Sequence, residues 1–174
     1  MAEADLERLQ IFAGERLVEI TTSEICDLPS ILSLQKLAYQ SEAELAGDFS
    51  IPPLIQTLGG ITEDFDNGVI LKALDNGEIV GSVRVRLVEN TAHIGRLIVL
   101  PQKQNRGIGT ALLLAAEKIY PCARFELFTS DRSSKNLALY VRNGYKEFRR
   151  EPLNEVVDLV FMEKLCEISG DYRS

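Results

Sequence analysis

The sequence of 174 residues contains no tryptophan, a single histidine and three cysteines. The cysteines are odd in number and match no metal-ligand spacing, so we expect neither a disulfide framework nor a metal site. No apolar run approaches the ~20 residues that a membrane span requires. The acidic start has no basic segment followed by an apolar stretch, so no secretory signal is expected. Together these absences predict a cytoplasmic protein without a membrane partner.

Acidic residues outnumber basic ones, 26 to 19, and the net charge of −7 argues against a nucleic acid as partner. The charge is unevenly distributed. Residues 1–90 hold 16 acids and 6 bases (6 − 16 = −10), whereas residues 91–174 hold 10 acids and 13 bases (13 − 10 = +3). Residues 91–116 contain no acid at all. This window is compatible with an anion site, and also with a chance gap in an apolar strand and helix.

Hydrophobic periodicity predicts one mixed α/β domain over residues 16–174, preceded by an extension (1–15) that is loosely ordered or helical. A period of two predicts strands at 16–21, 69–74, 79–88, 92–100, 125–129, 145–149 and 156–164. A helical period predicts helices at 27–42, capped by Asp27, and at 52–65, 107–120 and 134–143. Asp75-Asn76-Gly77 marks a hairpin, so residues 69–100 are expected to form an antiparallel meander. The second half then contains a βαβ crossover.

A glycine-containing loop, Gln-Asn-Arg-Gly-Ile-Gly at 104–109, separates a predicted strand from a predicted helix. The first amides of a helix lack internal partners, and glycine lets a phosphate approach them closely. The loop is neither a P-loop, since no Gly-Lys-Ser/Thr follows, nor a dinucleotide fingerprint, since a third glycine is missing. Taken alone, it is compatible with phosphate binding and with an ordinary turn.

The segment Ile-Gly-Arg-Leu-Ile-Val-Leu-Pro (94–101), followed by Gln-x-x-Gly-x-Gly, resembles the central strand and acetyl-CoA loop of the GNAT superfamily of N-acetyltransferases. Asn-Leu-Ala-Leu-Tyr-Val-Arg-Asn-Gly-Tyr (136–145) resembles the second signature of that family. The residue-level likeness is confined to 94–145, while the order of elements is similar over 16–164. The resemblance implies an α/β (α+β) fold with a mixed, mainly antiparallel sheet, splayed central strands and about four flanking helices.

The resemblance also implies acetyl-CoA as acyl donor, with no metal. The exposed edge of the central strand would contact the pantetheine arm, and the loop amides would contact the pyrophosphate. The second motif would complete the site. The implied cofactor-binding residues are Leu97, Ile98, Val99, Gln104, Asn105, Arg106, Gly107, Ile108, Gly109, Thr110, Asn136, Tyr140 and Arg142. Lys103, Arg132 and Lys135 would add basic surface.

For catalysis, the resemblance implies that Tyr140 donates a proton to the departing thiolate and that the Ile98 amide stabilises the developing oxyanion. Asn136, Tyr140 and Asn143 share one helix face by spacing, a pattern that also suits a core aromatic. The general base remains unassigned, because the central strand lacks the glutamate that many members carry. His93 is chemically suited to that task, yet its place early in the strand also fits a solvated histidine.

The acceptor side is less well defined. Between Lys36 and Lys72 lie six acids and no base, which suits either a solvated helix surface or a rim for a cationic amine such as a polyamine. Arg84 and Arg86 share one face of a strand and instead favour an acceptor with a carboxylate, such as an amino acid. The prediction is therefore transfer of acetyl to a primary amine of a small molecule in a ternary complex. The alternatives are a non-catalytic CoA-binding regulatory module, a protein amine as acceptor, and a different acyl donor. A homodimer is one possible assembly.

Overall fold

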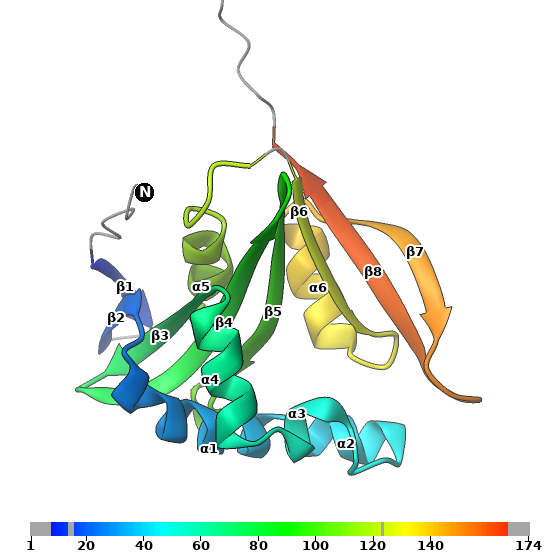
Figure 1. The fold of residues 1–174 in the computed structure, drawn as a ribbon, viewed down its shortest axis with the longest axis horizontal. Helices are drawn as coiled ribbons and strands as arrows, with labels where there is room; N and C mark the ends of the chain where they lie inside the picture. The colour runs from blue at the N-terminus through cyan, green and yellow to red at the C-terminus, as the bar shows by residue number, and fades with distance from the viewer. Residues whose placement is uncertain (1–7, 14–15, 123, 167–174) are drawn as a thin grey trace, which may run out of the picture.

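The computed structural model describes residues 8–13, 16–122 and 124–166. Its eight strands form one twisted sheet in the order β1-β2-β3-β4-β5-β6-β8-β7 (Figure 1). The strands are β1 Leu9–Ala13, β2 Arg16–Thr22, β3 Val69–Asp75, β4 Glu78–Val88, β5 Thr91–Val99, β6 Arg124–Ser130, β7 Lys146–Pro152 and β8 Asp158–Leu165. The α-helices are α1 Leu28–Ala38, α2 Gln40–Ala46, α3 Pro52–Ile55, α4 Leu58–Asp66, α5 Ile108–Ala116 and α6 Ser134–Arg142. Two short 3₁₀ turns are η1 Ile25–Asp27 and η2 Pro101–Lys103.

The predicted meander is confirmed, since β3, β4 and β5 pair antiparallel in chain order. Its first turn places Asn76 at φ 52° and Gly77 at φ 81°. Two consecutive positive φ values match the twist of a tight hairpin, which explains the Asn-Gly pair. The expected crossover is also present, because β5 and β6 are parallel and α5 connects them. The mixed, mainly antiparallel sheet is therefore the predicted one.

Strands β5 and β6 pair over a short stretch only, from Thr91 to His93 on β5. Beyond His93 they diverge, and Figure 1 shows them forming the two arms of an inverted V. A β-bulge accompanies the divergence. Gly95 pairs with Arg84, and Ile98 pairs with Ser82. Two residues of β5, Arg96 and Leu97, therefore lie opposite a single residue of β4. Arg96 takes a positive φ of 50° there. A bulge of this kind bends its strand, and the predicted splay is confirmed.

Helices cover both faces of the sheet. Helices α1 and α4 lie on one face, in front of the sheet in Figure 1, and α5 packs on the other. The approach of α5 is close, because a Cβ at Gly81 of β4 would lie 2.9 Å from Leu112 Cδ1. Apolar residues of α5 and of β2 to β6 make the main core, and a smaller cluster lies between α1, α4 and β3. In the part of the chain that is described, no helix is long and apolar enough to cross a membrane.

Several predicted boundaries are wrong. The expected helix 27–42 is interrupted at Tyr39 (φ −85°, ψ 0°), which separates α1 from α2. The expected helix 52–65 is interrupted at residues 56–57, whose backbone is extended. The Thr57 hydroxyl then caps α4 by accepting from Gly60 N–H at 3.2 Å. Asp27 does not cap α1, because its carboxylate accepts from Glu24 N–H and from Lys72.

The expectation of a helical or loosely attached start fails where residues are described. Residues 9–13 form β1, an edge strand that pairs antiparallel with β2. The strand is too short for an alternation of polar and apolar residues to identify it from the sequence. Phe12, one of its four apolar residues, is 78% exposed. The strand forms because the neighbouring β2 offers a partner, which local patterning does not reveal. Residues 1–7 and 14–15 of the predicted extension lie outside the described part.

Candidate functional site

A cavity of about 630 Å³ lies at the divergence of β5 and β6. Its walls come from the α1–α2 junction, the end of β5, the loop before α5, and α6. Most of the predicted cofactor-binding residues line it, namely Leu97, Ile98, Val99, Gln104, Asn105, Gly107, Ile108, Gly109, Thr110, Asn136 and Arg142. The two that do not line it are Arg106 and Tyr140. The structure therefore brings the strand edge, the glycine loop and the second motif to one space.

The N-terminus of α5 opens into this cavity. Gly107 precedes the helix at φ 84°, a left-handed conformation that favours glycine. The Ala111 N–H makes the first helical bond, to the Gly107 carbonyl at 3.0 Å. The amides of Ile108, Gly109 and Thr110 precede this bond, so they have no acceptor within the helix. Together with the helix dipole, they form an electropositive end that suits a phosphate group.

Basic side chains complete the charge of this cavity, although not all the predicted ones contribute. Arg132, Lys135 and Arg142 line it from the start and end of α6. Lys103 also lines it, but its Nζ lies 2.6 Å from Asp75 Oδ2, so its charge is partly neutralised. Arg106 is exposed. The charged side chains at the cavity therefore come more from α6 and the residues just before it than from the glycine loop.

Asn136 reaches across the cavity to α2. Its Nδ2 donates to Glu42 Oε1 at 3.1 Å and lies 3.4 Å from Thr129 Oγ1. Burial raises the pKa of Glu42, while hydrogen bonds from Ser133 and Asn136 oppose that rise. Sequence reasoning placed Glu42 only on an acidic rim. Its half-buried, bonded position depends on Ser133 and Asn136, which lie about 90 residues further along the chain, so no local pattern signals it.

Tyr140 is 6% exposed, with its ring centroid 6.0 Å from that of Tyr145. Burial raises the pKa of Tyr140 well above its ordinary value, and the neighbouring Tyr39 and Glu42 raise it further. Both neighbours line the cavity, so the phenol lies near its wall. The hydroxyl is protonated at neutral pH, as it is at the ordinary tyrosine pKa, so the side chain has a proton to give.

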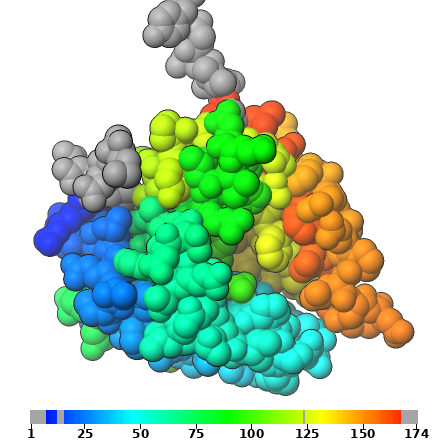
Figure 2. Space-filling model, in the orientation of Figure 1, coloured from blue at the N-terminus to red at the C-terminus, as the bar shows by residue number. Residues whose placement is uncertain are grey.

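A second cavity, of about 290 Å³, lies on the α4 side of the sheet, the side that faces the viewer in Figure 2. Tyr39 lines both cavities and is the residue that their linings share. Burial raises the pKa of Tyr39 to about 12, although Arg96 lowers it. His93 is exposed and lines the second cavity, which leaves its predicted alternatives open. Neither cavity holds a metal-binding group of His, Cys, Asp or Glu among the described residues.

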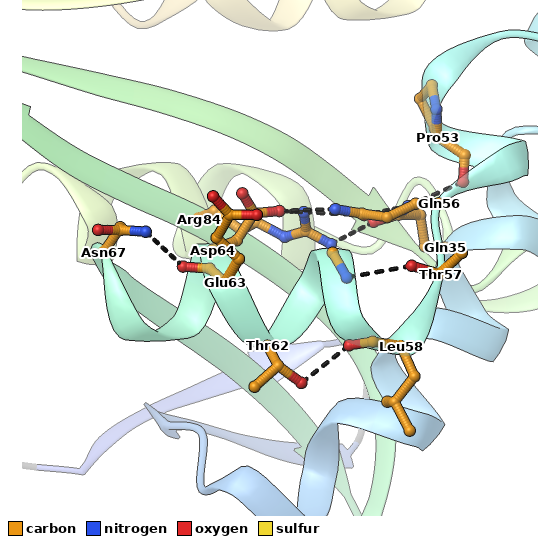
Figure 3. A network of polar contacts seen from close by, with 11 residues as sticks. Gln35, Pro53, Gln56, Thr57, Leu58, Thr62, Glu63, Asp64, Asn67 and Arg84 are labelled. Carbon is orange, nitrogen blue, oxygen red and sulfur yellow. Dashed lines mark hydrogen bonds and ion pairs between the residues drawn. The ribbon is translucent and has the colours of Figure 1, made fainter.

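Arg84 lies in the wall of the second cavity and is 9% exposed. Figure 3 shows its guanidinium enclosed by polar side chains of α1, α4 and the segment between α3 and α4. It donates to Gln35 Oε1 through Nη2, and through Nη1 to Asp64 and to Gln56 Oε1, the last at 3.1 Å. Burial lowers the pKa of Arg84 to about 10, with Asp64 acting against that shift. One predicted arginine is thus committed to holding α1 and α4 on the sheet.

Comparison with known proteins identifies a family and several solved structures of similar fold. The family model described as acetyltransferase (GNAT) family matches residues 28–145. The solved PaiA N-acetyltransferase of Thermoplasma acidophilum, in complex with coenzyme A, has a TM-score of 0.73 at 21% identity, over 86% of this chain and 99% of that one. The ribosomal-protein-S18-alanine N-acetyltransferase of Escherichia coli gives 0.72 at 17% identity, over 90% and 99%. At these identities the likeness shows the fold.

Two curated relatives are similar over parts of the chain. Spermidine N(1)-acetyltransferase of Thermoplasma acidophilum is 28% identical over 81 residues, which is 45% of this chain and 50% of the relative. The UPF0157 protein YqkA of Bacillus subtilis is 26% identical over 118 residues, which is 67% of this chain and 34% of the relative. The matches thus span half or less of these relatives' lengths.

Proposed function

Because the chain belongs to the acetyltransferase (GNAT) family, we propose that it transfers an acetyl group from acetyl-CoA to a primary amine of a small molecule. The observation that carries the proposal is the 630 Å³ cavity, where the free amides of α5, the unpaired edge of β5 and basic residues of α6 meet. These three features match the three parts of the donor: pyrophosphate, pantetheine arm and further phosphate charge. The spermidine N(1)-acetyltransferase relative supports an amine as acceptor.

On the donor side, each group of residues has a distinct task. The amides of Ile108, Gly109 and Thr110 donate to the pyrophosphate, and Arg142 adds full charge. Beyond His93, the β5 edge facing β6 has no strand partner among the described residues, so its backbone groups can bond to the amides of the pantetheine arm. The Val99 carbonyl already accepts from Gln104 Nε2 at 3.2 Å, so that bond would have to be exchanged if the arm uses this oxygen. The Asn136 amide nitrogen is already bonded to Glu42, so its carbonyl oxygen is the atom left to accept from the donor.

Transfer of the acetyl group from the thioester to the amine requires two proton transfers. The amine nitrogen attacks the thioester carbonyl carbon, the C–N bond forms and the C–S bond breaks. An amine with a pKa of ~10.4 is neutral in about 4 in 10,000 molecules at pH 7, so it must lose a proton before attack. No described residue is assigned as the base for this step, and the proton passes to solvent. Tyr140 gives its proton to the departing sulfur, and the Ile98 amide stabilises the oxyanion.

A thiol-release assay with acetyl-CoA tests the proposal against a broad panel of amines, amino acids and peptides. We expect release that depends on an amine and yields its N-acetyl product, identified by mass spectrometry. Calorimetry with coenzyme A alone provides the control for donor binding. Binding of coenzyme A without release on any acceptor would overturn the proposal and leave a CoA-binding module. Turnover confined to peptides would replace the small-molecule acceptor by a protein amine.

A further inference from the structure

The second cavity carries an unbalanced set of charges. It is lined by three arginines, Arg84, Arg86 and Arg96, and by two carboxylates, Asp64 and Glu126. Since this cavity lies on the opposite side of the shared Tyr39 from the donor cavity, its charge bears on the second substrate of the reaction.

Both carboxylates have partners of their own. Asp64 pairs with Arg84 and also accepts from Gln56 Nε2 at 2.7 Å. Glu126 accepts from Arg124 Nη1 at 2.6 Å, two residues earlier on the same strand, β6. Within the described part of the chain, no carboxylate lies within 4.0 Å of a nitrogen of Arg86 or Arg96. The guanidinium groups of the exposed Arg86 and the half-buried Arg96 are therefore the two at this cavity without a carboxylate partner among the described residues.

The partners of these arginines on other elements are weak acceptors. The guanidinium carbon of Arg96 lies 5.9 Å from the centre of the Tyr39 ring, over its face. The charge of Arg96 lowers the pKa of Glu42, but the Glu42 carboxylate accepts its hydrogen bond from Asn136 in the first cavity. The Nε atoms of Arg84 and Arg96 are buried and lack a hydrogen-bond partner among the described residues. A buried N–H group without an acceptor lowers the stability of the fold, and a ligand oxygen that accepts from it would remove this cost.

The shape of the cavity suits a small ligand. Its volume of about 290 Å³ is at the low end of ligand sites. Gly95 lies in its wall, opposite Arg84 in the β4–β5 register, and a Cβ there would enter open space. Arg86 faces His93 in the same register, so both rim residues stand on the same face of the sheet. A compact acceptor fits between Gly95, Tyr39 and the two arginines that lack a carboxylate partner among the described residues.

We infer that the acceptor is an amine that also carries a carboxylate, such as an amino acid, with the carboxylate bound by Arg86 and Arg96 and the amine directed past Tyr39 toward the donor. The inference rests on the proposed function and specifies its acceptor. Planar guanidinium groups bind carboxylates through paired hydrogen bonds, which fixes orientation as well as charge. A polyamine would instead bring positive charge to a cavity that already has an excess of it.

The acetyl transfer itself is unchanged. The amino nitrogen forms its bond to the acetyl carbon, the C–S bond breaks, the thiolate gains a proton, and the nitrogen loses one to water. The carboxylate takes no part in bond making. Its binding orients the nitrogen, so its loss should appear mainly in KM for the acceptor.

The experiment compares matched amines on the wild-type protein: lysine with cadaverine, phenylalanine with phenethylamine, and ornithine with putrescine, together with spermidine. We expect kcat/KM for the α-amino acid to exceed that of its decarboxylated partner by about tenfold or more, the size of one charged hydrogen bond. Equal rates within each pair, or a preference for spermidine, would overturn the inference while leaving the proposed function intact. Absence of turnover with every amine would overturn the proposed function, and the inference with it.

Variants test the residues. Arg86→Gln should raise KM for the favoured amino acid about tenfold, with kcat and the rate on the decarboxylated amine nearly unchanged. Arg86→Lys should restore part of that loss. Gly95→Val, which fills the cavity, should lower kcat/KM for the amino acid without changing KM for acetyl-CoA. Lys118→Gln removes the same charge from an exposed site outside both cavities and serves as the control. An Arg86→Gln variant that behaves as Lys118→Gln does would contradict the assignment.

Discussion

Asn136 Nδ2 lies 3.1 Å from Glu42 Oε1, although 94 residues separate the two in the chain. The contact joins α6, which carries the second motif, to α2, which belongs to the N-terminal helices. It crosses the cavity that opens between β5 and β6. The α2 wall of the proposed donor site is therefore tied to the α6 wall through Glu42, which also accepts a hydrogen bond from Ser133.

Replacing Glu42 by glutamine tests the state of this carboxylate. Its pKa is raised from 4.5, chiefly by burial, so the folded chain binds this proton more tightly than the unfolded chain does. Ionised Glu42 therefore lowers stability progressively as pH rises from about 4.5 through the folded pKa. Glu42→Gln should gain stability relative to wild type across that window, measured by urea denaturation at several pH values. A difference that does not vary with pH would contradict the raised pKa.

Tyr140→Phe removes the proposed proton donor while keeping the ring packed against Tyr145. We expect kcat to fall about 100-fold, since general acid catalysis contributes about that factor or more, with little change in KM for acetyl-CoA. Steady-state kinetics and calorimetry of coenzyme A measure the two quantities. Tyr120→Phe, a partly buried tyrosine outside the site, is the matched control. If both variants keep wild-type kcat, another group supplies the proton.

Arg142→Gln and Arg106→Gln separate two arginines that the family motifs place together. Arg142 lines the donor cavity and Arg106 does not. We expect Arg142→Gln to raise KM for acetyl-CoA about tenfold and to weaken its dependence on salt, because it removes a charged contact to phosphate. Arg106→Gln should change KM less than threefold, the range of an exposed charge. Equal effects would mean that the loop closes on the donor.

Asp64→Ala should destabilise the fold, because it removes the carboxylate partner of the buried Arg84 guanidinium. The expected loss is about 1–3 kcal/mol, at the lower end because Asp64 itself is 43% exposed. Urea denaturation measures it. Asp66→Ala on the same helix removes an exposed carboxylate and should stay within about 0.5 kcal/mol of wild type. Equal stabilities of the two variants would show that Arg84 needs no countercharge.

Two glycines of the α4 region should respond in opposite ways to alanine. At Gly68 a Cβ would lie 2.5 Å from the Val85 carbonyl oxygen, so Gly68→Ala should cost about 1–3 kcal/mol. Gly59 lies within α4 with only Thr57 Oγ1 near, at 3.8 Å, so Gly59→Ala should gain up to about 1 kcal/mol of helix propensity. The same denaturation assay distinguishes them. A stabilising Gly68→Ala would contradict the close approach of the two backbones.

The sequence predicted well those features whose causes are local. The Asn76-Gly77 turn, the alternation on its flanking strands and the glycine before α5 each act within a few residues, and the structure contains all three. The family motifs also led to most of the cavity lining. The misses have tertiary causes. The interruption at Tyr39, the positive φ of Arg96 and the strand β1 depend on contacts with distant segments. Glu42 belongs with them, since its role depends on Asn136.

The divergence of β5 from β6 also has a thermodynamic consequence. In the described part of the chain, backbone groups on the β6-facing edge of β5 beyond His93 have no strand partner, so a ligand that bonds to them binds the folded chain and not the unfolded one. Mass action then adds RT ln(1 + [L]/Kd) to the folding free energy, about 2.7 kcal/mol at a hundredfold excess over Kd. The melting temperature of this protein should therefore rise with coenzyme A concentration. Where coenzyme A is abundant, its binding at the donor site therefore contributes to the stability of the folded chain.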